Sequence, residues 1–143
     1  PADECGASSK AMIEAYTEAG LKPEDITYIN AHGTSTHLND MLETKAVKIA
    51  LGEEQARKVK INSTKSMTGH MLGGTGAVEA AVCALSIRDS FIHQTIGYTT
   101  PDPECDLDYC VDGPVEMPVN AALSNSLGFG GHNATLCFKK CTD

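Results

Sequence analysis

Apolar and polar positions follow two periods along this chain, one typical of helices and one typical of strands. Apolar residues recur at helical spacing over residues 8–19 and again over residues 40–51, where Asp40 and Glu43 could form a capping box. A third helix is predicted over residues 75–88 and is apolar on almost every side. We therefore expect this third helix to be buried on most of its faces.

Four shorter stretches have the composition and alternation of strands. These are residues 26–31, 59–64, 121–126 and 134–139. The intervening residues 53–58 are highly charged and are predicted to be a connection, and residues 91–119, which contain four prolines, are predicted to be irregular. The resulting order of three helices alternating with two strands, followed by two more strands, is consistent with a layered α/β sandwich.

Composition excludes several functional classes. The 143 residues allow one compact domain, and the net charge of −8 with scattered basic residues argues against nucleic-acid binding. No apolar run approaches the length of a membrane span, and residues 1–9 lack a basic start followed by an apolar stretch, so we expect a cytoplasmic location without membrane partners. The six cysteines include no Cys-x-x-Cys spacing, so we expect reduced thiols rather than a zinc site, with a surface pair of Cys105 and Cys110 or of Cys137 and Cys141 as the alternative.

Three glycine-containing segments carry the candidate chemistry, and each begins where a predicted strand ends. They are residues 31–36 (AHGTST), 65–70 (KSMTGH) and 125–133 (NSLGFGGHN). Loops at strand ends are where α/β proteins place their active sites. The chain is therefore predicted to be part of an enzyme, although none of its cysteines or serines has the surroundings of a recognisable nucleophile.

His32 and His70 occupy matching positions, beyond a strand end and beside a glycine. A single histidine in a loop more often makes a structural hydrogen bond than does chemistry, but two in matching contexts favour a shared role. His70 also precedes a helix N-terminus, which disfavours the imidazolium form. Two neutral imidazole donors directed at one point would stabilise an enolate or oxyanion.

Two further features need an explanation. Glu79 is a lone carboxylate in an apolar helix, which is costly unless it meets a cation or several donors. In the segment 128–131, glycines surround Phe129, so its backbone amide could face a developing oxyanion while its ring lines the site. The alternative is an ordinary glycine-rich hairpin with Phe129 packed in the core.

Taken together, these residues resemble the C-terminal half of the β-ketoacyl-acyl-carrier-protein synthases, most closely the elongating type II enzymes of bacterial fatty acid synthesis. The resemblance rests on residues 28–36, 63–70, 76–79 and 124–133 and extends along nearly all of the chain. It implies the thiolase-like layered α/β fold, with a mixed sheet and packed helices. That fold consists of two similar halves, and residues 1–143 would form the second.

The resemblance also implies a reaction. In this family a cysteine of the first half takes the acyl chain from acyl carrier protein, malonyl carrier protein is decarboxylated, and the enolate attacks the thioester in a Claisen condensation. His32 and His70 would hold the malonyl carbonyl, and Lys65 would orient His70, with Glu79 as its partner. The amide of Phe129 would complete an oxyanion hole. Substrate-binding positions would be Thr34 and Thr36, which contact phosphopantetheine, together with Gly128 and Gly130.

No cofactor is expected to be required, although some members of the family hold a structural sodium, potassium or magnesium ion. The matching ligands here are the backbone carbonyls of Asn30 and Ala31, together with Glu79, Ser124 and Asn125. The implied partners are acyl carrier protein, the first half of the same enzyme and a second copy in a homodimer. The chain departs from the family at His37, where proline is common, and it lacks the nucleophile, so the chain alone is expected to be inactive.

Three alternatives stay open on sequence alone. A polyketide ketosynthase would share every motif and differ mainly in its acyl pocket. A non-catalytic partner of the chain-length-factor kind would share the fold, although such partners tend to lose the two histidines that are present here. A module that binds acyl or pantetheine groups without turnover is the third alternative.

Overall fold

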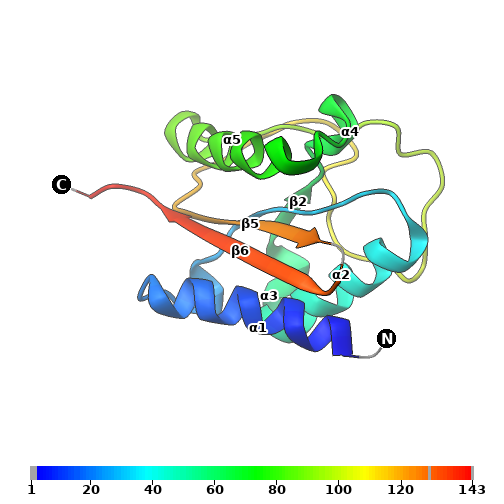
Figure 1. Cartoon of the computed structure of the whole chain (residues 1–143). Coiled ribbons are helices and arrows are strands. Elements are labelled where there is room, and N and C mark those ends of the chain that lie inside the picture. Colours follow the sequence, from blue (N-terminus) through cyan, green and yellow to red (C-terminus); the bar gives the residue numbers. More distant parts are fainter. Residues whose placement is uncertain (1–2, 129, 143) are drawn as a thin grey trace.

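A mixed sheet of four strands lies at the centre of the computed structural model, which describes residues 3–128 and 130–142. Its strands, in spatial order, are β2 (Lys60–Asn62), β1 (Tyr28–Asn30), β5 (Ala121–Gly128) and β6 (His132–Lys139). The first three run parallel, and β6 runs antiparallel to β5 (Figure 1). The predicted mixed α/β fold is confirmed.

Helices cover both faces of this sheet (Figure 1). One face carries α1 (Asp3–Glu18), α2 (His37–Leu51) and α3 (Glu53–Lys58), and the other carries α5 (Thr75–Asp89). The short helix α4 (Lys65–Thr68) follows the carboxyl end of β2, and single 3₁₀ turns occur at η1 (Pro23–Asp25) and η2 (Leu72–Gly74). The chain therefore forms three layers.

Alternation along the strands divides the core into two parts, because successive side chains point to opposite faces. Ile29 and Leu123 pack with residues of α1 and α2, such as Met12. Tyr28 packs instead with Ala122 and with Cys83 of α5. By the same alternation Asn30, which pairs with Ser124 in the register of β1 and β5, lies on the α5 face.

Two elements at the first face differ from the sequence predictions. Residues 53–58 form α3 rather than a charged connection, because the ion pairs Arg57–Glu53 (2.7 Å) and Lys58–Glu54 (3.2 Å) support one face. The predicted capping box at Asp40 is also wrong. Helix α2 begins at His37 after Thr36, and Glu43 is buried beneath the sheet loops.

Two predictions about the other face are corrected as well. The segment 91–119 contains a small antiparallel pair, β3 (Phe91–Ile92) and β4 (Val115–Glu116), which buries Ile92 completely. Helix α5 is buried in this chain along one stripe only, which consists of Thr75, Glu79, Cys83 and Ser86. Within residues 3–128 and 130–142, no helix is long and apolar enough to cross a membrane.

Candidate active site

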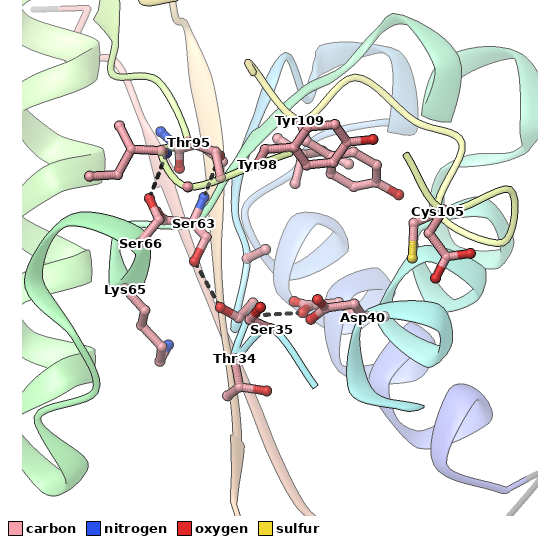
Figure 2. A pocket seen from close by; sticks show the side chains of 18 of the residues that line it. Thr34, Ser35, Asp40, Ser63, Lys65, Ser66, Thr95, Tyr98, Cys105 and Tyr109 are labelled. Atoms are coloured by element: carbon pink, nitrogen blue, oxygen red, sulfur yellow. Dashed lines mark hydrogen bonds between the residues drawn. The ribbon is translucent and has the colours of Figure 1, made fainter. Parts of the chain in front are cut away.

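The two predicted histidines meet where β1 and β2 end. His32 follows β1, and His70 follows α4, which itself begins two residues after β2. Their rings lie edge to face, with centroids 5.6 Å apart and an interplanar angle of 86°. A cavity of about 720 Å³ opens beside them, and its lining includes His70, Lys65 and Thr34 (Figure 2).

Burial sets the charge of His32, which is only 8% exposed. Removal from water, with smaller contributions from the nearby positive charge of Lys65 and from His70, lowers the pKa of its imidazole to about 4. The ring is therefore neutral at neutral pH. Its Nδ1 is buried and has no hydrogen-bond partner among the residues that the structure describes.

The ring of His70 is oriented by its own loop. The backbone N–H of Leu72 donates to its Nδ1 at 3.1 Å, and the hydroxyl of Thr75 lies 3.2 Å from the same nitrogen. Because a backbone N–H can only donate, Nδ1 acts as an acceptor and carries no proton. The neutral ring then presents its proton on Nε2, as a donor suited to an oxyanion.

A buried ion pair explains Glu79. Its Oε2 accepts a hydrogen bond from Nζ of Lys65 at 2.9 Å, and the two side chains are 1% and 5% exposed. Burial raises the pKa of the Glu79 carboxyl, and the hydrogen bond from Lys65 opposes this rise. The carboxylate in α5 therefore has the cation that its burial requires, and the pair fixes α4 against α5.

Glu43 is a site residue that the sequence analysis misassigned. Its buried carboxylate accepts the backbone N–H groups of His32 (2.7 Å) and Gly33 (3.0 Å), which holds the loop after β1 in place. Burial raises the pKa of Glu43, and these hydrogen bonds oppose the shift. The sequence could have indicated the burial of Glu43, because helical spacing places it on the same side of α2 as the buried Ala46 and Val47.

The predicted substrate-binding residues lie on two separate loops. The hydroxyls of Thr34 and Thr36 are 3.1 Å apart, and Thr36 directly precedes α2. Gly128 ends β5, and Gly130, with φ of +80°, begins the turn into β6. The predicted roles of Phe129 concern a residue outside those that the structure describes.

The predicted cation ligands divide between the two faces of the sheet. Asn30 and Ser124 are register partners on the α5 face, the face that Glu79 of α5 covers. Both Asn30 Oδ1 and Glu79 Oε1 are buried and lack a hydrogen-bond donor among the described residues. Unpartnered oxygens of this kind fit a hard cation.

The side chain of Asn125, by contrast, belongs to the opposite face. Its Nδ2 lies 3.4 Å from the carboxylate of Glu43, and its Oδ1 accepts a hydrogen bond from Thr135 at 3.0 Å. Ala31 likewise packs in the core on the α1 and α2 side. The side chains of Asn30, Ser124 and Glu79 thus share one face, whereas the ligand atoms predicted for Asn30 and Ala31 are their backbone carbonyls.

The rim of the cavity holds a separate polar cluster of His37, Asp102 and Glu104. Nδ1 and Nε2 of His37 lie 3.1 Å and 3.5 Å from the carboxylates of Asp102 and Glu104. This contact joins the first turn of α2 to the long loop that precedes β4. Exposed pairs of this kind contribute little to stability.

The chain resembles known proteins in both sequence and fold. The model of the β-ketoacyl synthase C-terminal domain matches residues 1–99. The chain is 54% identical over 140 residues to 3-oxoacyl-[acyl-carrier-protein] synthase 2 of Staphylococcus aureus (strain COL), an alignment that covers 98% of the chain and 34% of the relative. The corresponding synthase of Synechocystis is 52% identical over 133 residues, covering 93% of the chain and 32% of the relative.

Solved structures show the same fold. A β-ketoacyl synthase from Burkholderia phymatum superposes with a TM-score of 0.89 and 34% identity, over 96% of the chain and 33% of that structure. A type II polyketide ketosynthase, solved in complex with its acyl-carrier protein, superposes with a TM-score of 0.85 and 40% identity, over 94% of the chain and 34% of that structure. The chain thus spans about a third of the length of these proteins. On this evidence of sequence and fold, the chain belongs to the β-ketoacyl synthase family and matches its C-terminal domain.

Proposed function

We propose that this chain is the second half of an enzyme that condenses an acyl-enzyme with malonyl-acyl carrier protein, with loss of carbon dioxide, in fatty acid chain elongation. The observation that carries this proposal is the edge-to-face pair of His32 and His70 beside the cavity. The 54% identity to a 3-oxoacyl-[acyl-carrier-protein] synthase 2 supports the fatty acid pathway.

The two imidazoles act as neutral hydrogen-bond donors to one carbonyl oxygen. When the malonyl thioester loses carbon dioxide, the electrons of the broken bond pass to this oxygen as an enolate. His70 donates through Nε2–H, because its Nδ1 is occupied as an acceptor. His32 is neutral at physiological pH. Both rings can therefore donate a hydrogen bond to the developing negative charge, and neither ring has to lose a proton first.

Lys65 and Glu79 position this pair rather than react. The ion pair anchors the first residue of the single-turn helix α4, and His70 follows that helix by two residues. The positive charge of Lys65 also lowers the pKa of His32. Holding the histidines in a productive geometry is worth a large part of the rate, because misplacement of about 1 Å can cost roughly 100-fold.

The nucleophilic cysteine is supplied by the first half of the protein. Burial, followed by the charge of Glu79, raises the pKa of Cys83 to about 12, and burial raises that of Cys110 to about 11, which disfavours a thiolate at either position. The amide of Phe129 completes the oxyanion hole. The phosphopantetheine of acyl carrier protein reaches the site past Thr34, Thr36, Gly128 and Gly130.

The complete enzyme acts in the cytoplasm as a homodimer and requires no cofactor, and this chain alone is inactive. A structural sodium, potassium or magnesium ion would be held by Asn30, Ser124 and Glu79, where two buried oxygens lack hydrogen-bond donors. Such an ion would supply positive charge that stabilises the buried oxygens.

Replacement of His70 tests the proposal in the complete protein. His70→Ala should abolish the decarboxylation of malonyl-acyl carrier protein, measured as carbon dioxide release, while acyl transfer to the cysteine, measured by mass spectrometry, stays largely intact. Lys58→Ala, at an exposed end of α3, serves as the control and should retain both activities. Decarboxylation by His70→Ala at the wild-type rate would contradict the proposed role.

A polyketide ketosynthase is the second candidate, because a type II polyketide ketosynthase is among the similar structures. Comparing turnover of saturated acyl and poly-β-keto carrier substrates by the complete protein distinguishes the two pathways. Preference for the saturated chain supports fatty acid elongation. Preference for the poly-β-keto chain would assign the protein to polyketide synthesis.

A further inference from the structure

Residues 93–96 form a strap that lies against residues 62–66, the segment that leads from β2 into α4 (Figure 2). Three hydrogen bonds made through side chains join these two segments. Asn62 Nδ2 donates to the carbonyl of His93 (2.9 Å), Ser63 N–H donates to Thr95 Oγ1 (3.1 Å), and Ile96 N–H donates to Ser66 Oγ (3.1 Å). The strap is thus hydrogen-bonded to residues that precede and follow Lys65 in the sequence, and Lys65 is the residue that pairs with Glu79.

The ring of His93 adds a fourth contact whose direction can be deduced. Its Nδ1 lies 2.7 Å from the carbonyl oxygen of Gln94, which can only accept, so Nδ1 carries a proton. In the neutral ring Nε2 is then an acceptor, and the hydroxyl of Thr64, 2.8 Å away, donates to it. Thr64 Oγ1 in turn accepts a hydrogen bond from Asn30 Nδ2 at 2.6 Å.

These bonds belong to a closed circuit that begins and ends at His93. Asn30 uses its second amide proton for the Tyr28 hydroxyl (3.1 Å), which donates to Asn62 Oδ1 (2.7 Å). Asn62 completes the circuit at the His93 carbonyl. Tyr28, Asn30, Asn62 and Thr64 are all buried, so each of these groups depends on the circuit for its partner.

We propose that His93 is a positioning residue of the condensation reaction, which it serves by fixing Thr64, and hence Lys65 and His70, to the sheet. This inference rests on the proposed function. Asn30 and Asn62 lie on β1 and β2, whereas Thr64 directly precedes α4, so the circuit ties the turn before α4 to two strands of the sheet. Loss of the Nε2 acceptor would leave the proton of the buried Thr64 hydroxyl without an acceptor and weaken the attachment of the start of α4 to the sheet.

Two substitutions of His93 in the complete protein separate this role from simple destabilisation. His93→Leu removes the acceptor, whereas His93→Gln places an amide oxygen at similar reach. For malonyl-acyl carrier protein decarboxylation, we expect His93→Leu to lower kcat by about tenfold with KM nearly unchanged, and His93→Gln to restore most of the rate. Acyl transfer to the cysteine should be unaffected by either substitution.

Nitrogen NMR of the wild-type imidazole provides a readout independent of activity. The circuit requires the proton of the neutral His93 ring to lie on Nδ1, so a proton on Nε2 would overturn the proposal. A wild-type kcat in His93→Leu, or equal losses in the Leu and Gln variants, would also overturn it. If the wild-type protein fails to decarboxylate malonyl-acyl carrier protein, both the proposed function and the positioning role of His93 are wrong. The NMR measurement tests the hydrogen-bond circuit independently of that activity.

Discussion

Burial of single polar side chains gives the site its chemical character. His32 and Glu79 are almost fully buried, yet one is neutral because of that burial and the other keeps a cationic partner. The sequence identified both residues and predicted that Glu79 needs either a cation or several hydrogen-bond donors. It could not assign Glu43, because a carboxylate near a helix start is more often a cap than a buried acceptor for a neighbouring loop.

The pKa of His32 makes stability depend on pH in a defined window. The pKa of His32 is about 4 in the folded protein, against an ordinary value of 6.5, so between these values only the unfolded chain takes up a proton at this position. The stability contributed by neutral His32 is complete above pH 6.5 and decreases as the pH falls toward 4. The total loss is on the order of 3 kcal/mol.

The His32→Asn variant should therefore lack this part of the acid sensitivity. Urea unfolding of wild type and variant at pH 7, 5.5 and 4.5 gives the difference in their free energies of unfolding. This difference should shift in favour of the variant as the pH is lowered, because other titrating groups cancel in the comparison. A constant difference from pH 7 to 4.5 would contradict the shifted pKa.

At the scale of elements, the loops after β1 and β2 approach each other closely enough to require glycine. Gly33 has φ of +49°, and a Cβ at this position would lie 2.8 Å from Ser63 Oγ and 2.9 Å from Ser63 Cβ. The motif His32-Gly33 marked the loop in the sequence. Only the parallel pairing of β1 with β2 shows which residue the glycine faces.

Gly33→Ala should destabilise the protein more than a glycine substitution that meets open space. Gly20→Ala is the matched control, because Gly20 also has positive φ (+75°) but a Cβ there would meet nothing within 4 Å. We expect Gly33→Ala to cost about 1–3 kcal/mol more, since the added methyl group must displace Ser63. Thermal unfolding measures both variants, and equal losses would show that the contact is relaxed without cost.

At the scale of the whole molecule, α5 presents an uncovered apolar side. Val78 and Leu85 are 37% and 46% exposed, and Leu136 on the edge strand β6, register partner of Ser124, is 52% exposed on the same side of the sheet. The sequence predicted burial of α5 on most faces, which this chain alone does not provide. A second protein layer over α5, as the proposed first half would supply, reconciles the two observations.

Charged substitutions on α5 should therefore prevent assembly with the first half. When the two halves are produced separately and mixed, wild type should co-elute as a complex in size-exclusion chromatography, and Val78→Lys/Leu85→Lys should not. Ile49→Lys on α2 is the control, because Ile49 is 59% exposed but belongs to the opposite layer, and it should assemble normally. Assembly of the double variant would rule out α5 as the contact surface.

The sequence by itself determined the elements with long periodic patterns, the two histidines, Lys65 and the family. Those features are local, because helical periodicity, strand-end glycines and short motifs are all read from neighbouring residues. Tertiary structure alone decided which side chains meet. The Glu43 contacts with the His32 loop and the circuit through His93 join residues from different elements, and the capping-box prediction failed for the same reason. Burial and partners depend on how the layers pack, and no local pattern contains that information.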